Sequence, residues 1–164
     1  MTRRLILMRH AKSDWGSPAQ TDHARPLNAR GRRDATALGA WLRANAYLPD
    51  SALVSAAART RETWARLGLG GDVHFAEALY HAPPETLLTQ LRAARGACVL
   101  MLAHNPGIAE FAAWLLAVPP RHPRFDDYPT CATLIADFDI ADWADLRPGT
   151  GRAAAFVTPR DLAS

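Results

Sequence analysis

Short runs of apolar residues alternate along this chain with longer segments in which apolar residues recur every three or four positions. The run at 5–8, Leu-Ile-Leu-Met, is typical of a buried strand, and similar runs stand at 97–102 and 132–138. In the segment 28–46 the three-and-four spacing predicts an amphipathic helix, for which Asn28 is a suitable N-cap. The pattern therefore predicts strands and helices in alternation.

The other elements continue this alternation. Shorter strands are predicted at 52–54, 73–75 and 154–157. Turn residues give the limits of three further helices. These helices are predicted to begin at Ser55 as a cap, at Pro83-Pro84 and at Gly107, and to end before Gly68, Gly96 and Pro119.

Strands that alternate with helices define the fold class as α/β, built from βαβ units. We expect a single three-layer domain over residues 1–164, with a mostly parallel central sheet of about five to six strands and helices on both faces. The segment 118–129 contains four prolines, but a strand follows it, so we interpret it as a rigid loop and not as a linker. With 164 residues and 49% hydrophobic content, the chain is long enough to bury a core.

Charge and composition exclude some partners. Charged residues make up 21% of the chain, are well mixed and leave a net charge of +3, so we expect no nucleic-acid partner. The segment 1–4, which contains Arg3 and Arg4, precedes an apolar stretch too short for a secretory signal, and no run approaches the roughly 18 apolar residues of a membrane span. Cys98 and Cys131 stand in apolar runs, which favours buried thiols over a disulfide. We expect a soluble, cytoplasmic protein without a membrane partner.

Candidate chemistry stands where two predicted strands end. Arg9 and His10 follow the first strand, and His104 follows the fourth. Arg59 belongs to the beginning of the second predicted helix. Because ligands of open α/β sheets bind beyond the carboxyl ends of the strands, we expect these four side chains to meet at one edge of the sheet.

Two arginines and two histidines at one place predict a phosphoryl-transfer site. The arginines supply fixed positive charge for the oxygens of the transferring group. A neutral histidine nitrogen can attack phosphorus and form a covalent phosphohistidine, which divides one difficult step into two easier ones. The helices that begin after His104 and near Ser55 would direct backbone N–H groups at the same anion.

Four motifs of the chain also carry a family resemblance, in both order and spacing. They lie at 7–13 (LMRHAKS), 25–31 (RPLNARG), 55–63 (SAAARTRET) and 103–107 (AHNPG). The chain resembles the histidine phosphatase superfamily, which has the phosphoglycerate-mutase-like fold, and within it the SixA-type phosphohistidine phosphatases. The resemblance implies that His10 accepts the phosphoryl group, that Arg9, Arg59 and His104 complete the phosphate-binding pocket, and that neither a cofactor nor a metal is needed.

The general acid is less well defined by the motifs. Glu77, three residues before Tyr80, is similar to the acid of the mutase-like branch, although His81 stands where that branch has glycine. Glu77 is therefore a possible general acid, with a solvated carboxylate as the alternative. Trp15 is a candidate wall of the pocket. The other histidines are interpreted as surface or loop residues: His23, His74, His81 and His122.

Three functions remain open. The first is a metal-independent phosphatase that works through phosphohistidine on His10 and acts on a phosphohistidine-carrying protein, since imidazole leaves more readily than an alkoxide and no capping insertion is present. The second is a phosphatase for a small phosphomonoester. The third is a phospho-ligand-binding module without catalysis. The sequence leaves the oligomeric state open.

Overall fold

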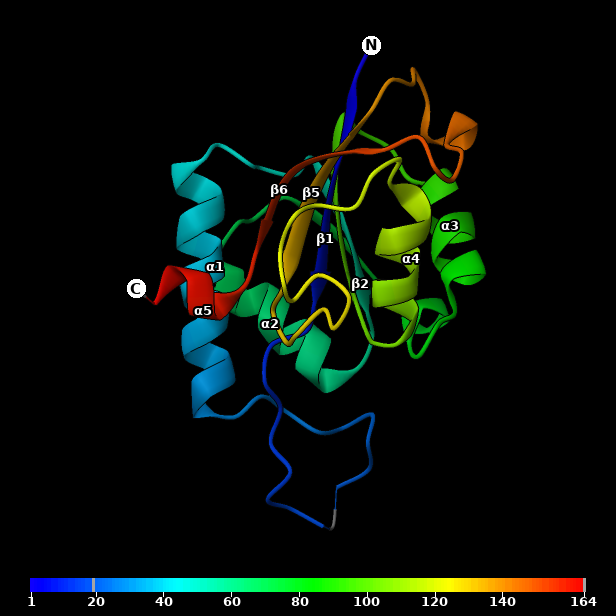
Figure 1. Ribbon diagram of the computed structural model, residues 1–164. Coiled ribbons are helices and arrows are strands. Elements are labelled where there is room, and N and C mark those ends of the chain that lie inside the picture. Colours follow the sequence, from blue (N-terminus) through cyan, green and yellow to red (C-terminus); the bar gives the residue numbers. More distant parts are fainter. Residues whose placement is uncertain (19, 164) are drawn as a thin grey trace.

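The computed structural model describes residues 1–18 and 20–163 as a central sheet with helices on each side (Figure 1). The elements are, in chain order, β1 (Arg3–Arg9), α1 (Ala29–Ala44), β2 (Ser51–Ser55), α2 (Ala58–Leu67), β3 (Asp72–Ala76), the 3-10 turn η1 (Glu77–Leu79), α3 (Pro84–Arg92), β4 (Cys98–Ala103), α4 (Gly107–Leu115), β5 (Thr133–Phe138), the 3-10 turn η2 (Trp143–Asp145), β6 (Arg152–Val157) and α5 (Pro159–Leu162).

The six strands lie in the order β3-β2-β4-β1-β5-β6. Strands β3, β2, β4 and β1 are parallel, and β5 is antiparallel to both of its neighbours, so it alone of these strands runs in the opposite direction. The predicted α/β fold with a mostly parallel sheet is confirmed. Strands β1 and β4 are neighbours in register, with Arg9 opposite Ala103. The residues that follow them, His10 and His104, therefore emerge at the same edge of the sheet.

Alternate side chains of β1 enter two separate cores, which makes the molecule three layers thick. Leu5 and Leu7 pack with residues of α3 and α4, whereas Ile6 and Met8 pack with residues of α1 and α2. Figure 1 shows α1 and α5 on one side of the sheet and α3 and α4 on the other. Helices cover both faces, as the near-continuous apolar strands require.

The first residues of the helices confirm one predicted N-cap and contradict another. The Asn28 side chain accepts a hydrogen bond of 2.8 Å from the Gly31 N–H and caps α1, as predicted. The prediction that Ser55 caps the second helix is wrong. Ser55 is the last residue of β2, where it pairs with Ala76 of β3, and α2 begins only at Ala58. Its hydroxyl is thereby free for a role in the site.

Two glycines allow close backbone contacts beside the carboxyl edge of the sheet. A Cβ atom on Gly31 would lie 2.0 Å from the carbonyl oxygen of Lys12, and one on Gly107 would lie 1.9 Å from that of Ala82. Neither position has room for a side chain. Glycine at these positions lets α1 pack against the segment after β1, and lets α4 pack against the segment after η1.

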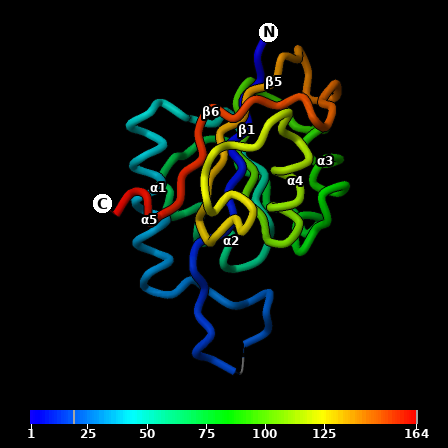
Figure 2. The backbone as a smooth tube through the Cα atoms, in the orientation of Figure 1, coloured from blue at the N-terminus to red at the C-terminus, as the bar shows by residue number. Residues whose placement is uncertain are grey.

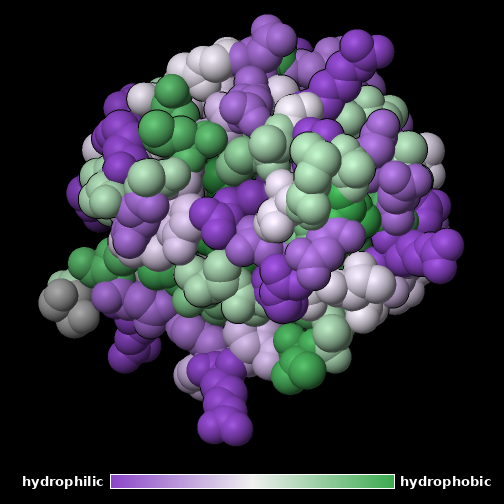
Figure 3. All heavy atoms as spheres, turned by 90° about the horizontal axis from the view of Figure 1, so that it is seen from above, coloured by the Kyte–Doolittle hydropathy of each residue, from purple (hydrophilic) through white to green (hydrophobic). Residues whose placement is uncertain are grey.

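The segment between β1 and α1 extends beyond the carboxyl edge of the sheet, as Figure 2 shows in blue. The view from above, of the opposite end of the molecule, is covered mostly by hydrophilic side chains with small hydrophobic groups between them (Figure 3). Within residues 1–18 and 20–163, no helix has the length and apolar character needed to cross a membrane.

Candidate active site

A cavity of about 300 Å³ opens at the carboxyl edge of the sheet, where the sequence predicts the site. It brings together the four strand-end and helix residues that the sequence singles out, namely Arg9, His10, Arg59 and His104, and Trp15 at its rim. The rest of its lining consists of Lys12, Ser13, Asp22, Arg25, His81, Asn105 and Thr130.

The His10 ring is fixed in one orientation. Its Nδ1 atom lies 2.7 Å from the carbonyl oxygen of Ala11, so Nδ1 carries the proton and donates it to that oxygen. Burial lowers the pKa of His10 to about 3, and the charges of Arg9, Arg59 and Arg25 act in the same direction. The imidazole is therefore neutral near pH 7, with a lone pair on Nε2.

His104 is the second buried histidine of the cavity, and its ring centroid lies 5.3 Å from that of His10. Its Nε2 atom is hydrogen-bonded to the Ser55 hydroxyl at 2.7 Å. Ser55, at the end of β2, therefore holds the His104 ring. Burial lowers the pKa of His104 to about 2, with further lowering from His10 and Arg59. The Nδ1 atom has no partner among the described residues and remains available for a ligand.

The buried Arg59 and the partly buried Arg9 supply fixed positive charge. Arg59 is 2% exposed, and its Nη1 donates a hydrogen bond of 2.7 Å to the carbonyl oxygen of Asp22. Arg9 donates from Nη1 to the carbonyl oxygen of Tyr128 at 3.1 Å. Burial, and then the charge of Arg59, lowers the pKa of Arg9. The Nε atoms of both arginines lack partners among the described residues, so the pair retains capacity for an anion.

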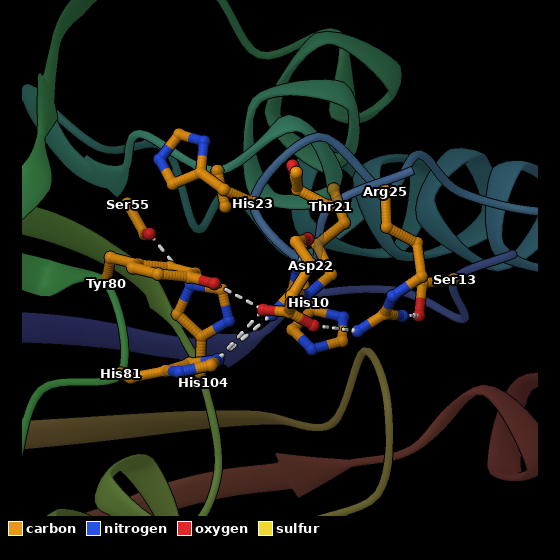
Figure 4. A network of polar contacts seen from close by, with 12 residues as sticks. His10, Ser13, Thr21, Asp22, His23, Arg25, Ser55, Tyr80, His81 and His104 are labelled. Carbon is orange, nitrogen blue, oxygen red and sulfur yellow. Dashed lines mark hydrogen bonds and ion pairs between the residues drawn. The ribbon is translucent and has the colours of Figure 1, made fainter. Parts of the chain in front are cut away.

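A carboxylate, that of Asp22, lies among these cationic groups (Figure 4). Its Oδ2 accepts from Arg59 Nη2 at 3.0 Å and from the Tyr80 hydroxyl, and its Oδ1 accepts from Arg25 Nη2 at 2.7 Å. Although burial acts to raise its pKa, the hydrogen bonds from Tyr80, Arg25 and Arg59 hold the pKa of Asp22 well below its usual range. Asp22 is ionised and neutralises part of the arginine charge.

Sequence reasoning missed Asp22, Arg25 and His81 as site residues. Arg25 opens the second motif, and Asp22 stands three residues before it, so their spacing was the available signal. The Arg25 guanidinium also lies 3.7 Å above the ring of Trp15, which is 73% exposed. His81 was interpreted as a surface or loop residue, and it does lie in a loop, but it lines the cavity.

Glu77 is not brought to the cavity with the other predicted site residues. It lies on η1, and both of its carboxylate oxygens are 3.1 Å from His23 Nε2. Its side chain is 71% exposed, and Glu77 is absent from the cavity lining. In residues 1–18 and 20–163 no three His, Cys, Asp or Glu side chains are arranged to hold a metal ion.

Comparisons with known sequences identify the family of the chain. The family model for the histidine phosphatase superfamily (branch 1) matches residues 5–80. The uncharacterized protein Rv1276c of Mycobacterium tuberculosis is 34% identical over 161 residues, which cover 93% of this chain and all of that protein. The chain belongs to the histidine phosphatase superfamily, as its motifs predict.

Solved structures agree with the fold. The structure of the putative phosphohistidine phosphatase SixA from Nakamurella multipartita superposes with a TM-score of 0.84 at 30% identity, covering 97% of each chain. The mycobacterial glucosyl-3-phosphoglycerate phosphatase Rv2419c has a TM-score of 0.61 at 19% identity, over 94% of this chain and 98% of that one. The predicted phosphoglycerate-mutase-like fold of SixA type is confirmed.

Proposed function

We propose that this protein is a metal-independent phosphatase in which Nε2 of His10 attacks the phosphorus atom and accepts the phosphoryl group. The hydrogen bond from Nδ1 to Ala11 carries this proposal, because it leaves the lone pair on the nitrogen that faces away from the backbone. The lowered pKa keeps this nitrogen unprotonated. A neutral, fixed imidazole is suited to nucleophilic attack.

The groups around His10 suit the charge of the transferring phosphoryl group. Arg9, Arg25 and Arg59 line the same cavity, and their fixed charges favour the equatorial oxygens. His104, whose ring centroid lies 5.3 Å from that of His10, offers its unpartnered Nδ1. Attack by His10 forms the P–N bond and breaks the bond to the leaving group. Water then attacks phosphorus, the P–N bond breaks, and phosphate leaves.

We favour phosphohistidine on a protein as the substrate. The cavity is small, at the lower end of the range for ligand pockets, so it accepts a phosphoryl group and little more than one ring. Trp15 and Lys12 stand at its rim, where the surface of a partner could rest. The similarity to the SixA structure from Nakamurella multipartita supports the same substrate class.

A small phosphomonoester is the second candidate substrate, because a cavity of about 300 Å³ also fits a compact ester. A phospho-ligand-binding module without catalysis is the third candidate function. A neutral His10 with a free Nε2 speaks against it, since binding alone would be served equally well by a protonated donor.

The test compares a phosphohistidine-carrying protein with a panel of small phosphomonoesters, with rapid quenching to trap the phosphoenzyme. We expect phosphate on His10 in the wild type, none in His10→Ala, and a higher kcat/KM for the phosphohistidine protein. His122→Gln is the control, because His122 is bonded to Asp161 away from the cavity. Label on serine or cysteine, or full turnover by His10→Ala, would overturn the mechanism. Higher activity on one ester would assign the second substrate class.

A further inference from the structure

A third histidine, His81, stands at the mouth of the cavity and has no part in the chemistry described above. Its Nε2 atom lies 3.3 Å from Oδ2 of Asp22 and 3.2 Å from Nη2 of Arg59. Its side chain is 53% exposed, in contrast to the buried His10 and His104. Figure 4 shows the ring pointing toward Asp22 beside His104.

The loop that carries His81 holds this ring over the site. His81 has a φ of 50°, the left-handed conformation, which is uncommon for residues other than glycine. The ring stacks on Tyr80 with centroids 4.2 Å apart and meets the His104 ring edge-on at 5.3 Å. The next residue, Ala82, is packed against Gly107 at the start of α4. These contacts fix His81 relative to His104.

We propose that His81 is the proton donor to the leaving group, and that Asp22 positions its ring. The inference rests on the proposed function, since it assigns the acid of the same reaction. Without substrate, Nε2 of His81 is within reach of both the Asp22 carboxylate and the Arg59 guanidinium; when the ring is protonated, Nε2–H can donate to Asp22 alone, because a guanidinium accepts no hydrogen bond. A leaving atom bound above the phosphoryl pocket takes the place of that carboxylate oxygen as the acceptor.

The step balances with His81 as a protonated imidazole. Nε2 of His10 forms a bond to phosphorus, the bond from phosphorus to the leaving atom breaks, and the leaving atom takes the bonding electrons and the proton from His81 Nε2. Water then attacks phosphorus, the P–N bond returns its electrons to His10, and one proton of that water passes to His81. Both histidines end as they began.

The other titratable groups of the site are less suited to this role. Burial lowers the pKa values of His10 and His104, so neither is present near pH 7 as the imidazolium that a general acid needs. The Tyr80 hydroxyl donates to Asp22, and burial followed by that carboxylate raises its pKa. Glu77 is bonded to His23 outside the cavity lining.

The test uses His81→Gln, with Glu77→Gln as the matched control from the same turn. General acid catalysis is worth about 10² to 10⁴ in rate and matters most for poor leaving groups. We expect His81→Gln to lower kcat/KM for phenyl phosphate by at least about 10² and to change that for 4-nitrophenyl phosphate by less than about threefold. Glu77→Gln should follow the wild type on both esters.

A pH profile separates catalysis from positioning. The charged and titratable groups that face His81 are Asp22, Arg59, Tyr80 and His104. For phenyl phosphate, the fall in kcat/KM at high pH should be present in the wild type and absent from His81→Gln.

The same samples distinguish failure of this inference from failure of the proposed function. If phospho-His10 forms in both the wild type and His81→Gln, but kcat/KM depends equally on the leaving group in the two proteins, His81 is not the acid and the proposed function stands. If the wild type forms no phospho-His10, both proposals fall. Circular dichroism of His81→Gln should match the wild type, since the side chain is half-exposed; a loss of activity equal on all esters would mean that His81 only shapes the site.

Discussion

The Nδ1 atom of His10 lies 2.7 Å from the carbonyl oxygen of Ala11, the next residue along the chain. This contact joins a side chain to the backbone of the adjacent residue and therefore needs no other element of the fold to select the tautomer. Burial then keeps the ring neutral, because the lowered pKa of about 3 lies far below the ordinary range. One local hydrogen bond thus decides which nitrogen can react.

We predict that the phosphoryl group is found on Nε2 of His10 and not on Nδ1. Nδ1 is occupied by Ala11, whereas Nε2 has no hydrogen-bond partner among the described residues. The phosphoenzyme, trapped by acid-free quenching and unfolded in alkaline denaturant, can be assigned by ³¹P NMR against both phosphohistidine isomers. A signal from the Nδ1 isomer would contradict the tautomer assigned here.

Loss of a preorganised donor should slow the reaction strongly. We predict that Arg59→Ala and His104→Ala each lower kcat by about 10² or more, the usual effect of removing one donor to a developing anion. Arg33→Ala is the control, since Arg33 is an exposed arginine on α1. Steady-state kinetics on one substrate measure all three. A rise in KM with unchanged kcat would show that these groups bind the ground state and the transition state equally.

Chelation should leave the activity unchanged. The positive charge of the cavity comes from arginine side chains, which a chelator does not remove. We predict equal rates before and after treatment with EDTA followed by buffer exchange. A large loss, restored by one divalent ion, would replace the histidine mechanism with metal-assisted hydrolysis.

The buried histidines should make the protein less stable as the pH falls. In the folded state their pKa values are lowered to about 3 and about 2, whereas in the unfolded chain each is about 6.5. Between these values the unfolded chain binds more protons, so the free energy of unfolding decreases as the pH decreases. Each histidine contributes a slope of up to about 1.4 kcal/mol per pH unit.

Urea unfolding between about pH 6.5 and about pH 5.5 measures this slope, above the pH at which most carboxylates begin to titrate. His10→Asn and His104→Asn should each reduce the slope by the contribution of one proton. His74→Asn, at an exposed position of β3, should not change it. The same stability at both ends of this range in the wild type would mean that both rings accept protons in the folded state.

Local patterns were sufficient to predict the sheet, the helices and the cluster around His10. The apolar run of β1 is long enough to be buried on both faces, and parallel strands place their carboxyl ends together, so Arg9, His10 and His104 follow from the order of the elements. Arg59 follows from its place in the first turn of α2.

The rest of the site depends on contacts that have no local signal. Serine is a residue type that often caps helices. Ser55 instead pairs with β3 as the last residue of β2, and its hydroxyl is hydrogen-bonded to His104. Asp22 lies in the segment between β1 and α1, whose course has no periodicity. His81 enters the cavity because of a left-handed backbone angle and the packing of Ala82 on Gly107, which tertiary structure alone decides.

The Asp22 carboxylate accepts hydrogen bonds from donors that a bound phosphate ion would also need. It accepts hydrogen bonds from Arg25 and Arg59, so an oxyanion that enters the cavity competes for these donors and is repelled by the negative charge. We predict that Asp22→Asn binds inorganic phosphate about tenfold more tightly, a change of about 1.4 kcal/mol, because the amide is neutral and a weaker acceptor.

Competitive inhibition of 4-nitrophenyl phosphate hydrolysis by phosphate measures this effect in both proteins. The control is Asp139→Asn, which removes an exposed carboxylate that is paired with Arg152 away from the cavity. The gain should shrink at high salt, since ions screen the repulsion between a half-exposed carboxylate and the incoming anion. Weaker phosphate binding by Asp22→Asn would instead show that Asp22 holds Arg25 and Arg59 in the positions that bind the substrate.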